Sequence, residues 1–145
     1  MIVLDANVLL YAYNASAAQH QRARAWVEQA FSGVEPIGLP WFTISAFLRI
    51  STHLKVFAQP FSASEAAEIV GSWFDAPAVA ALEPGDRFWE IFSKLMVDSQ
   101  VSGALVSDAV LAAIAIEHGA HLATTDRDFR RFDGLKLLDP VTGGS

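Results

Sequence analysis

The stretch IVLDANVLL at residues 2–10 decides how the rest of the chain is interpreted. It opens with three aliphatic residues, the first two of them β-branched, and this short apolar run predicts a buried strand. Asp5 follows the run directly. The chain therefore begins with a predicted strand whose carboxyl end carries a carboxylate, and a similar order, a short apolar run and then an aspartate, recurs at residues 122–126.

Short apolar runs and amphipathic segments alternate along the remainder of the chain. Further strands are predicted within residues 36–40, 78–82, 121–124 and 136–138. Short buried strands that are separated by helices pair in parallel through right-handed crossovers. The predicted fold class is therefore α/β, a sheet covered by helices.

Apolar residues at helical spacing predict the helices of this fold. Three such stripes lie within residues 23–31, 66–74 and 88–96. A further helix is predicted from about Trp41 to Val56. Ser107 or Asp108 is predicted to cap a helix that is apolar almost all round, which is typical of a buried helix, and Gly119 is predicted to end it.

Composition limits the classes of protein and partner. The 145 residues are 52% apolar and 18% charged, which fits one domain and excludes intrinsic disorder. We expect a single domain at residues 1–140 and a flexible tail at 141–145. The net charge of −6 means that contact with nucleic acid requires a local basic patch. Cysteine is absent and no segment resembles a signal peptide or a membrane span, so we expect a cytoplasmic protein without a membrane partner.

Ligands of such folds bind at the carboxyl ends of the strands, and two strand ends and one helix start could bring three aspartates to this rim of the sheet. Asp5 and Asp126 follow predicted strands, and Asp108 begins the buried helix. Clustered carboxylates repel one another unless a cation lies between them. Their hard oxygens suit Mg²⁺ or Mn²⁺, which implies metal-assisted hydrolysis of a phosphodiester.

Each of these acids also has a purely structural interpretation. Asp5 suits the cap of a helix that starts near Ala6, and Asp108 suits an N-cap or first-turn position, where the helix dipole favours an anion. Asp126 and Asp128 suit the cap of a short turn before Phe129. The residues alone leave both interpretations open.

Three segments together resemble a known family. IVLDANVLL (2–10), LVSDAVLAA (105–113) and LATTDRDF (122–129) resemble, in order and spacing, acidic motifs of PIN-domain ribonucleases, and in particular of VapC-type toxins of bacterial toxin–antitoxin modules. The resemblance runs from Met1 to about Pro140. It implies a three-layer α/β/α fold with a parallel sheet of about five strands.

The resemblance also implies an activity and partners. VapC-type proteins are endoribonucleases that depend on Mg²⁺ or Mn²⁺ and cut RNA, often tRNA or ribosomal RNA. By resemblance, Asp5, Asp108 and Asp126 would hold the metal ion and its attacking water, and Thr124 would support them, with Asn7 as a further candidate. The family also implies a homodimer and a VapB-like antitoxin whose C-terminal segment blocks the active site.

The chain departs from the family pattern at one position. The family commonly has a Glu on the helix after the second strand, and here Ala46 aligns with it, with no acid anywhere in residues 41–52. Asp128 is either a substitute ligand or a turn residue. The missing carboxylate keeps open a second function, a non-catalytic PIN domain that binds RNA or a protein. A phosphoaspartate enzyme is disfavoured, because Asn7 stands where such enzymes have a second Asp.

Arginines close to the acids are candidates for RNA binding. Arg127 and Arg130 follow Asp126 and alternate with phenylalanines, a pattern that also fits a solvated face over core aromatic residues. Arg49 lies on the helix that lacks the Glu. It is suited to grip a phosphate in a bidentate manner, or equally to pair with Asp5 or Asp108.

Overall fold

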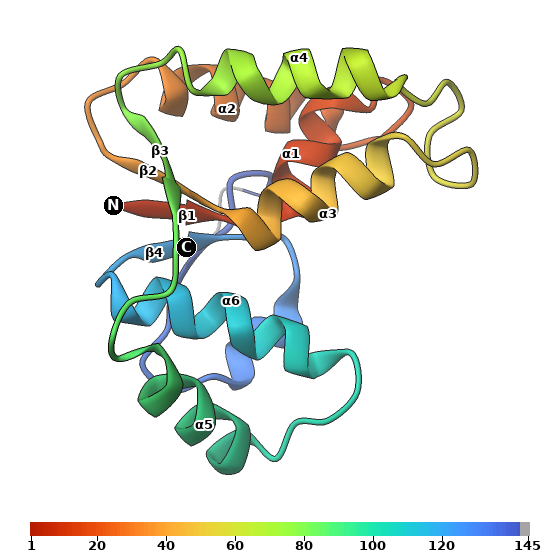
Figure 1. Ribbon diagram of the computed structural model, residues 1–145. Coiled ribbons are helices and arrows are strands. Elements are labelled where there is room, and N and C mark those ends of the chain that lie inside the picture. The colour runs from red at the N-terminus through yellow and green to blue at the C-terminus, as the bar shows by residue number, and fades with distance from the viewer. Residues whose placement is uncertain (143–145) are drawn as a thin grey trace.

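The computed structural model describes residues 1–142, and these contain one five-stranded sheet between two layers of helices (Figure 1). All neighbouring strands are parallel, in the order β3-β2-β1-β4-β5. The strands are β1 (Ile2–Leu4), β2 (Ile37–Pro40), β3 (Val79–Leu82), β4 (His121–Ala123) and β5 (Lys136–Leu138). The predicted α/β class and its parallel sheet of about five strands are confirmed.

The helices divide between the two faces of the sheet. They are α1 (Ala6–Tyr13), α2 (His20–Phe31), α3 (Trp41–Ser51), α4 (Ala63–Trp73), α5 (Phe88–Ser99), α6 (Leu105–Glu117) and the short 3₁₀ helix η1 (Arg127–Arg131). Figure 1 shows α1 to α4 above the sheet and α5 and α6 below it. Among the described residues, no helix is both long and apolar enough to cross a lipid bilayer.

Each face of the sheet buries its own hydrophobic core. Along β1, Leu4 packs with the helices of one face and Val3 with those of the other, as the two-residue period of a strand requires. Ala123 and Leu122 of β4 divide in the same way. Burial on both faces explains why these strands read as continuous apolar runs in the sequence.

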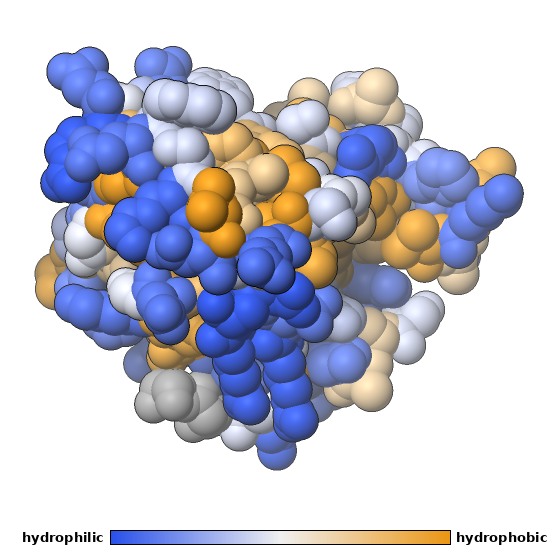
Figure 2. All heavy atoms as spheres, turned by 90° about the horizontal axis from the view of Figure 1, so that it is seen from below, coloured by the Kyte–Doolittle hydropathy of each residue, from blue (hydrophilic) through white to orange (hydrophobic). Residues whose placement is uncertain are grey.

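Helix α3 is shorter than predicted. It ends at Ser51 instead of near Val56, because the chain turns back there: the Phe61 amide donates to the Ser51 carbonyl, and Phe57 is buried beneath the turn. The segment that follows α3 projects at the right of Figure 1. Figure 2 shows hydrophobic side chains on this projection, where Leu54 is 80% exposed.

Helix α6 begins earlier than predicted. Its first residue is Leu105, so neither Ser107 nor Asp108 caps it, and Asp108 lies within the first turn. The turn at Gly103, whose φ is 61°, starts the helix, since the Val106 amide already donates to the Gly103 carbonyl. Gly119, at φ 63°, ends the helix as predicted.

The end of the described chain is tied to the domain. Val141, which the sequence places in the expected tail, is buried against the core on the α1–α4 side. Its carbonyl accepts a hydrogen bond from Arg22, and its amide donates to Asp139. Residues 143–145 of the expected tail lie outside the described residues.

Candidate active site

The candidate site lies at the carboxyl ends of β1 and β4, which are neighbours in the centre of the sheet. The chain leaves β1 into α1 on one face, whereas after β4 it enters η1, whose Phe129 packs in the core of the other face. Such a divergence opens a crevice at the sheet edge. The Asp5 amide donates to the Ala123 carbonyl at 2.9 Å, which holds Asp5 beside Thr124.

Thr124 is the centre of a hydrogen-bond network in this crevice. Its hydroxyl donates to Oδ2 of Asp5 at 2.8 Å and accepts from the Asp126 amide at 3.0 Å and from Nδ2 of Asn7 at 3.3 Å. Asn7 also accepts from the Thr125 amide at 3.5 Å. Thr124 is buried, so its hydroxyl fixes the position of the Asp5 carboxylate without competition from water.

Three further carboxylates meet beside this network. One oxygen from each of Asp108, Asp126 and Asp128 lies within 4.8 Å of the others. Asp126 also caps η1, because its Oδ1 accepts from the Asp128 amide at 2.9 Å. Asp126 can thus cap η1 with one carboxylate oxygen and belong to the acidic group in the same conformation.

Burial and like charges raise the pKa of Asp108. The pKa reaches about 6, chiefly through burial and then through repulsion from Asp126, Asp5 and Asp128, with Arg131 acting in the opposite direction. A carboxyl in this setting is stabilised either by a proton or by a bound cation. The set of hard oxygen donors fits a divalent metal ion such as Mg²⁺ or Mn²⁺.

The pKa of Asp5 is also raised. Burial raises its pKa, and the charge of Asp126 adds to this, while the hydrogen bond from Thr124 and the backbone amides of Ala6 and Asn7 lower it. Asp5 stands at the N-cap position of α1 without making a side-chain capping bond.

Helix α3 reaches the same edge of the sheet without an acid. The Thr43 hydroxyl donates to the Leu4 carbonyl at 2.8 Å, immediately before Asp5. Ala46 lies one turn further along α3 and is half-buried. Ala46 thus lies on α3 close after its contact with the end of β1, and this helix carries no carboxylate.

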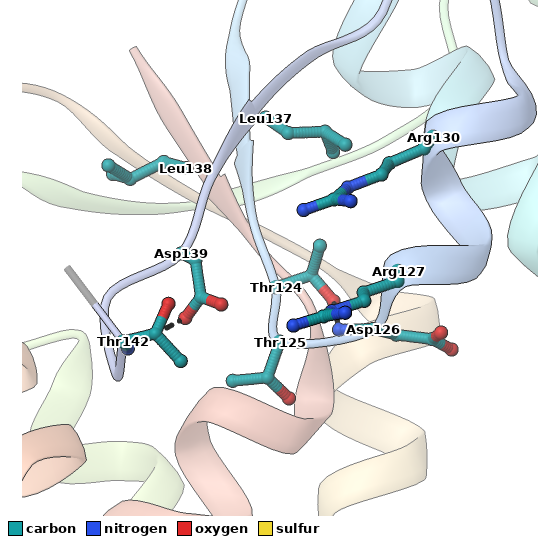
Figure 3. Close-up of a pocket in the computed structure, with 9 residues that line it drawn as sticks. All are labelled: Thr124, Thr125, Asp126, Arg127, Arg130, Leu137, Leu138, Asp139 and Thr142. Atoms are coloured by element: carbon teal, nitrogen blue, oxygen red, sulfur yellow. Dashed lines mark hydrogen bonds between the residues drawn. The ribbon is translucent and has the colours of Figure 1, made fainter. Parts of the chain in front are cut away.

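The candidate arginines fall into two groups. Arg127 and Arg130 line a hollow of about 230 Å³ between η1 and the end of β5 (Figure 3). Arg49 is exposed on α3, and among residues 1–142 no ion pair joins it to Asp5 or Asp108. The predicted alternative in which Arg49 pairs with one of these acids is therefore absent.

Asp139 also faces this hollow, although the sequence motifs do not single it out. It follows β5 directly, as Asp5 follows β1, so the order of strand and carboxylate was a signal for it. Although burial acts to raise its pKa, hydrogen bonds from Thr142 and Val141 and the charge of Arg127 hold the pKa below its ordinary value. Asp139 is thus an ionised group at the same edge of the sheet.

Comparison with known proteins agrees with this geometry. A family model of the PIN domain matches residues 2–135. Ribonuclease VapC37 of Mycobacterium tuberculosis is 35% identical over 140 residues, which cover 97% of each chain. Ribonuclease VapC33 of the same species is 38% identical over 141 residues, which cover 97% of this chain and 99% of VapC33.

A similar fold occurs in a solved structure. VapBC2 from Rickettsia felis, solved with a DNA fragment from its promoter, contains a chain that superposes with a TM-score of 0.66. The match covers 95% of this chain and 98% of that one at 16% identity, and at this identity it shows the shared fold alone. The resemblance to PIN-domain ribonucleases of the VapC type is confirmed over nearly the whole chain. The chain therefore belongs to the PIN domain family, as a relative of the VapC ribonucleases.

Proposed function

We propose that this protein is the toxin of a type II toxin–antitoxin module, an endoribonuclease that hydrolyses phosphodiester bonds of RNA, with tRNA or ribosomal RNA as substrate. The observation that carries the proposal is the group formed by the Asp108, Asp126 and Asp128 carboxylates, whose charges act together with that of Asp5 at the end of β1, in a chain whose relatives are named VapC ribonucleases. Since RNA is the proposed substrate, the cytoplasm is the proposed place of action.

In this proposal Asp5, Asp108 and Asp126 hold Mg²⁺ or Mn²⁺, and Asp128 is a further ligand in place of the absent Glu. When bound, such an ion lowers the pKa of its water and neutralises charge on the phosphoryl group. The carboxylates orient that water, and Thr124 holds Asp5 in position through its 2.8 Å hydrogen bond. Asn7 supports Thr124 at 3.3 Å.

The proposed RNA contacts come from arginines at the rim. Arg127 and Arg130 lie on η1, directly after Asp126, and Arg49 lies on the exposed side of α3. Because the protein has a net charge of −6, these local cations must attract the RNA backbone against the overall charge. The Arg49 guanidinium can hold a phosphate with two parallel hydrogen bonds, and Arg127 and Arg130 contact the RNA from η1.

The proposed partners are a second copy of the chain and a small VapB-like antitoxin. Support comes from the relatives, which are VapC ribonucleases, and from the similar fold in the VapBC2 complex. In this proposal the antitoxin's C-terminal segment covers the acidic crevice and keeps RNA out. The exposed apolar residues around the start of α3, such as Trp41 and Phe42, offer area for a protein contact.

A cleavage assay tests the activity. Purified protein without antitoxin is incubated with total tRNA and ribosomal RNA in Mg²⁺, in Mn²⁺ and in EDTA. We expect cuts at discrete sites with either metal, none in EDTA, and none from Asp5→Ala or from a folded Asp108→Asn. The matched control is Asp86→Ala, which removes an exposed acid outside the crevice.

Two results would contradict the proposal. Metal-dependent cuts by Asp108→Asn at the wild-type rate would remove Asp108 from the mechanism. Folded, partner-free protein that cuts no RNA under any metal would favour the second function, a non-catalytic PIN domain. Binding of RNA without cleavage, measured by a shift in electrophoretic mobility, would then identify RNA as its ligand.

A further inference from the structure

A hollow beside the acidic crevice differs from it in chemistry. It has a volume of about 230 Å³ and lies between η1 and the end of β5. Figure 3 shows that the Asp126 carboxylate points away from this hollow. Since Asp126 lines the hollow and also belongs to the acidic group, the two sites share a wall.

Two uncommitted guanidinium groups form one side of the hollow. Arg127 and Arg130 extend from η1 into it (Figure 3). Within residues 1–142 neither side chain donates a hydrogen bond or forms an ion pair, whereas the neighbouring Arg131 does both with Asp128. Arg127 acts on Asp139 through its charge alone, so the N–H groups of Arg127 and Arg130 are open to a bound molecule.

The opposite side presents a fixed acceptor. Oδ1 of Asp139 accepts from the amides of Val141 and Thr142 at 3.0 and 3.1 Å, so the turn after β5 holds this carboxylate in place. The Thr142 side chain also donates to this carboxylate, and of the about four acceptor positions of an ionised carboxylate these three hydrogen bonds leave one open. Leu137 adds an aliphatic surface beside Arg130.

This arrangement suits a planar, neutral and polar ligand better than a phosphate. A phosphate would be repelled by Asp139 and gains nothing from an aliphatic wall. A nucleobase has apolar faces for Leu137 and for stacking on a guanidinium plane, and polar edges for hydrogen bonds. The hollow is smaller than the roughly 300–1,000 Å³ of pockets for drug-sized ligands, which fits a single base.

The polarity of the two sides distinguishes among the bases. Guanine offers two adjacent acceptors, O6 and N7, which an arginine binds in a bidentate manner, whereas adenine and cytosine present an amino donor at that position. Guanine also has N–H donors on another edge for the open acceptor capacity of Asp139. We propose that the hollow between η1 and β5 binds one unstacked base of the RNA next to the scissile bond, with guanine preferred. This inference rests on the proposed ribonuclease function.

A titration of the metal-free full chain tests the binding directly. Amide signals of ¹⁵N-labelled protein are followed by NMR while GMP, AMP, CMP, UMP or inorganic phosphate is added. We expect GMP to shift the amides of η1 and of residues 137–142 at lower concentration than the other nucleotides, and phosphate to leave them unchanged. Arg130→Met should weaken GMP binding by about tenfold, the loss of one good bidentate contact. Arg87→Met is the matched control, since Arg87 pairs with Glu90 outside the hollow.

The alternatives give different results. Equal shifts from phosphate and GMP would overturn the base pocket in favour of an anion site, and no shift at these amides would overturn it outright. Equal shifts from all four nucleotides would overturn the guanine preference. Because the titration detects no cleavage, GMP binding by a protein that cuts no RNA would refute the proposed nuclease and leave the pocket standing. Cleavage of RNA by a protein that does not bind GMP would refute the base pocket and leave the proposed nuclease standing.

Discussion

The hydroxyl of Thr124 donates a 2.8 Å hydrogen bond to the carboxylate of Asp5 and so joins the ends of two neighbouring parallel strands. The two residues are 119 positions apart in the chain. The same hydroxyl accepts from the Asp126 amide at 3.0 Å, which couples the position of Asp5 to the start of η1. One buried side chain therefore sets the geometry of two acids that the proposed mechanism requires.

Replacing this hydroxyl tests the coupling. Thr124→Val keeps the shape of the side chain but leaves Asp5 without its donor and the Asp126 amide without its acceptor. Unsatisfied buried groups cost about 1–3 kcal/mol each, and these two are only partly buried, so together they should lower the free energy of unfolding in urea by about 1–3 kcal/mol. RNA cleavage should fall by at least about tenfold.

Thr124→Ser serves as the control for this prediction, since it retains the hydroxyl while losing a methyl group. It should keep most of the activity and lose less stability than Thr124→Val. If the two variants cleave RNA equally slowly, packing of the methyl group rather than the hydrogen bond is what matters at this position.

The raised pKa of Asp108 predicts a pH dependence of stability in metal-free protein. The folded-state pKa is about 6 and the ordinary value is 3.8, so the folded state binds this proton more tightly than the unfolded chain. The resulting stabilisation is fully present below pH 3.8 and is lost as the pH rises through about 6. Asp108→Asn stays neutral and escapes this loss.

Urea unfolding in EDTA measures the effect as a difference between the two proteins, which cancels the titration of groups that do not interact with Asp108. The free energy of unfolding of Asp108→Asn relative to wild type should increase across this pH range by about 1–2 kcal/mol, after allowance for the partial exposure of Asp108. Saturating Mg²⁺ should reduce the increase. A difference that does not vary with pH would show that Asp108 is not perturbed in the folded state.

The position of the acids could be predicted because it depends on few features of the sequence. An apolar run that ends at Asp5 or shortly before Asp126 marks the carboxyl end of a strand, and parallel strands bring such ends to one edge of the sheet. The strands are short and buried on both faces, so their limits are sharp in the sequence. The same rule applied to β5 would also have indicated Asp139.

The remaining features depend on tertiary contacts. The apolar pattern of α3 continues in the sequence past Ser51, where the helix ends. The end is explained by a tertiary contact, the hydrogen bond from the Phe61 amide to the Ser51 carbonyl. The start of α6 depends on the backbone at Gly103, not on a capping side chain. Whether Arg49 forms an ion pair depends on which acidic groups lie opposite α3 in the fold. The helical periodicity of the sequence does not tell which groups those are.

The half-buried Ala46 offers a gain-of-function test. It lies one turn beyond Thr43, which contacts the end of β1, so a Glu at this position should add a carboxylate to the crevice. Additional ligand charge tightens binding of hard cations. We expect Ala46→Glu to bind Mn²⁺ about tenfold more tightly than wild type by isothermal titration calorimetry. Ala46→Gln, similar in size and neutral, should not, and equal affinities for the two variants would place residue 46 outside the metal site.

The two arginines Arg49 and Arg131 should differ in their effect on RNA. Arg131 is engaged within the protein, since its Nε donates to the Asp128 carbonyl at 2.9 Å and its guanidinium lies 3.7 Å from the Asp128 carboxylate. Arg49 is exposed and makes no ion pair among the described residues, so its full charge is available to a phosphate.

We therefore expect Arg49→Ala to weaken RNA binding more than Arg131→Ala. Loss of one phosphate contact should lower the affinity for all RNA sequences to a similar degree and should reduce the slope of log affinity against log salt by about 1. Binding of a labelled tRNA in EDTA, at several salt concentrations, measures both quantities without cleavage. Equal losses and equal slopes for the two variants would show that Arg49 has no special role, and that the exposed side of α3 lies away from the path of the RNA.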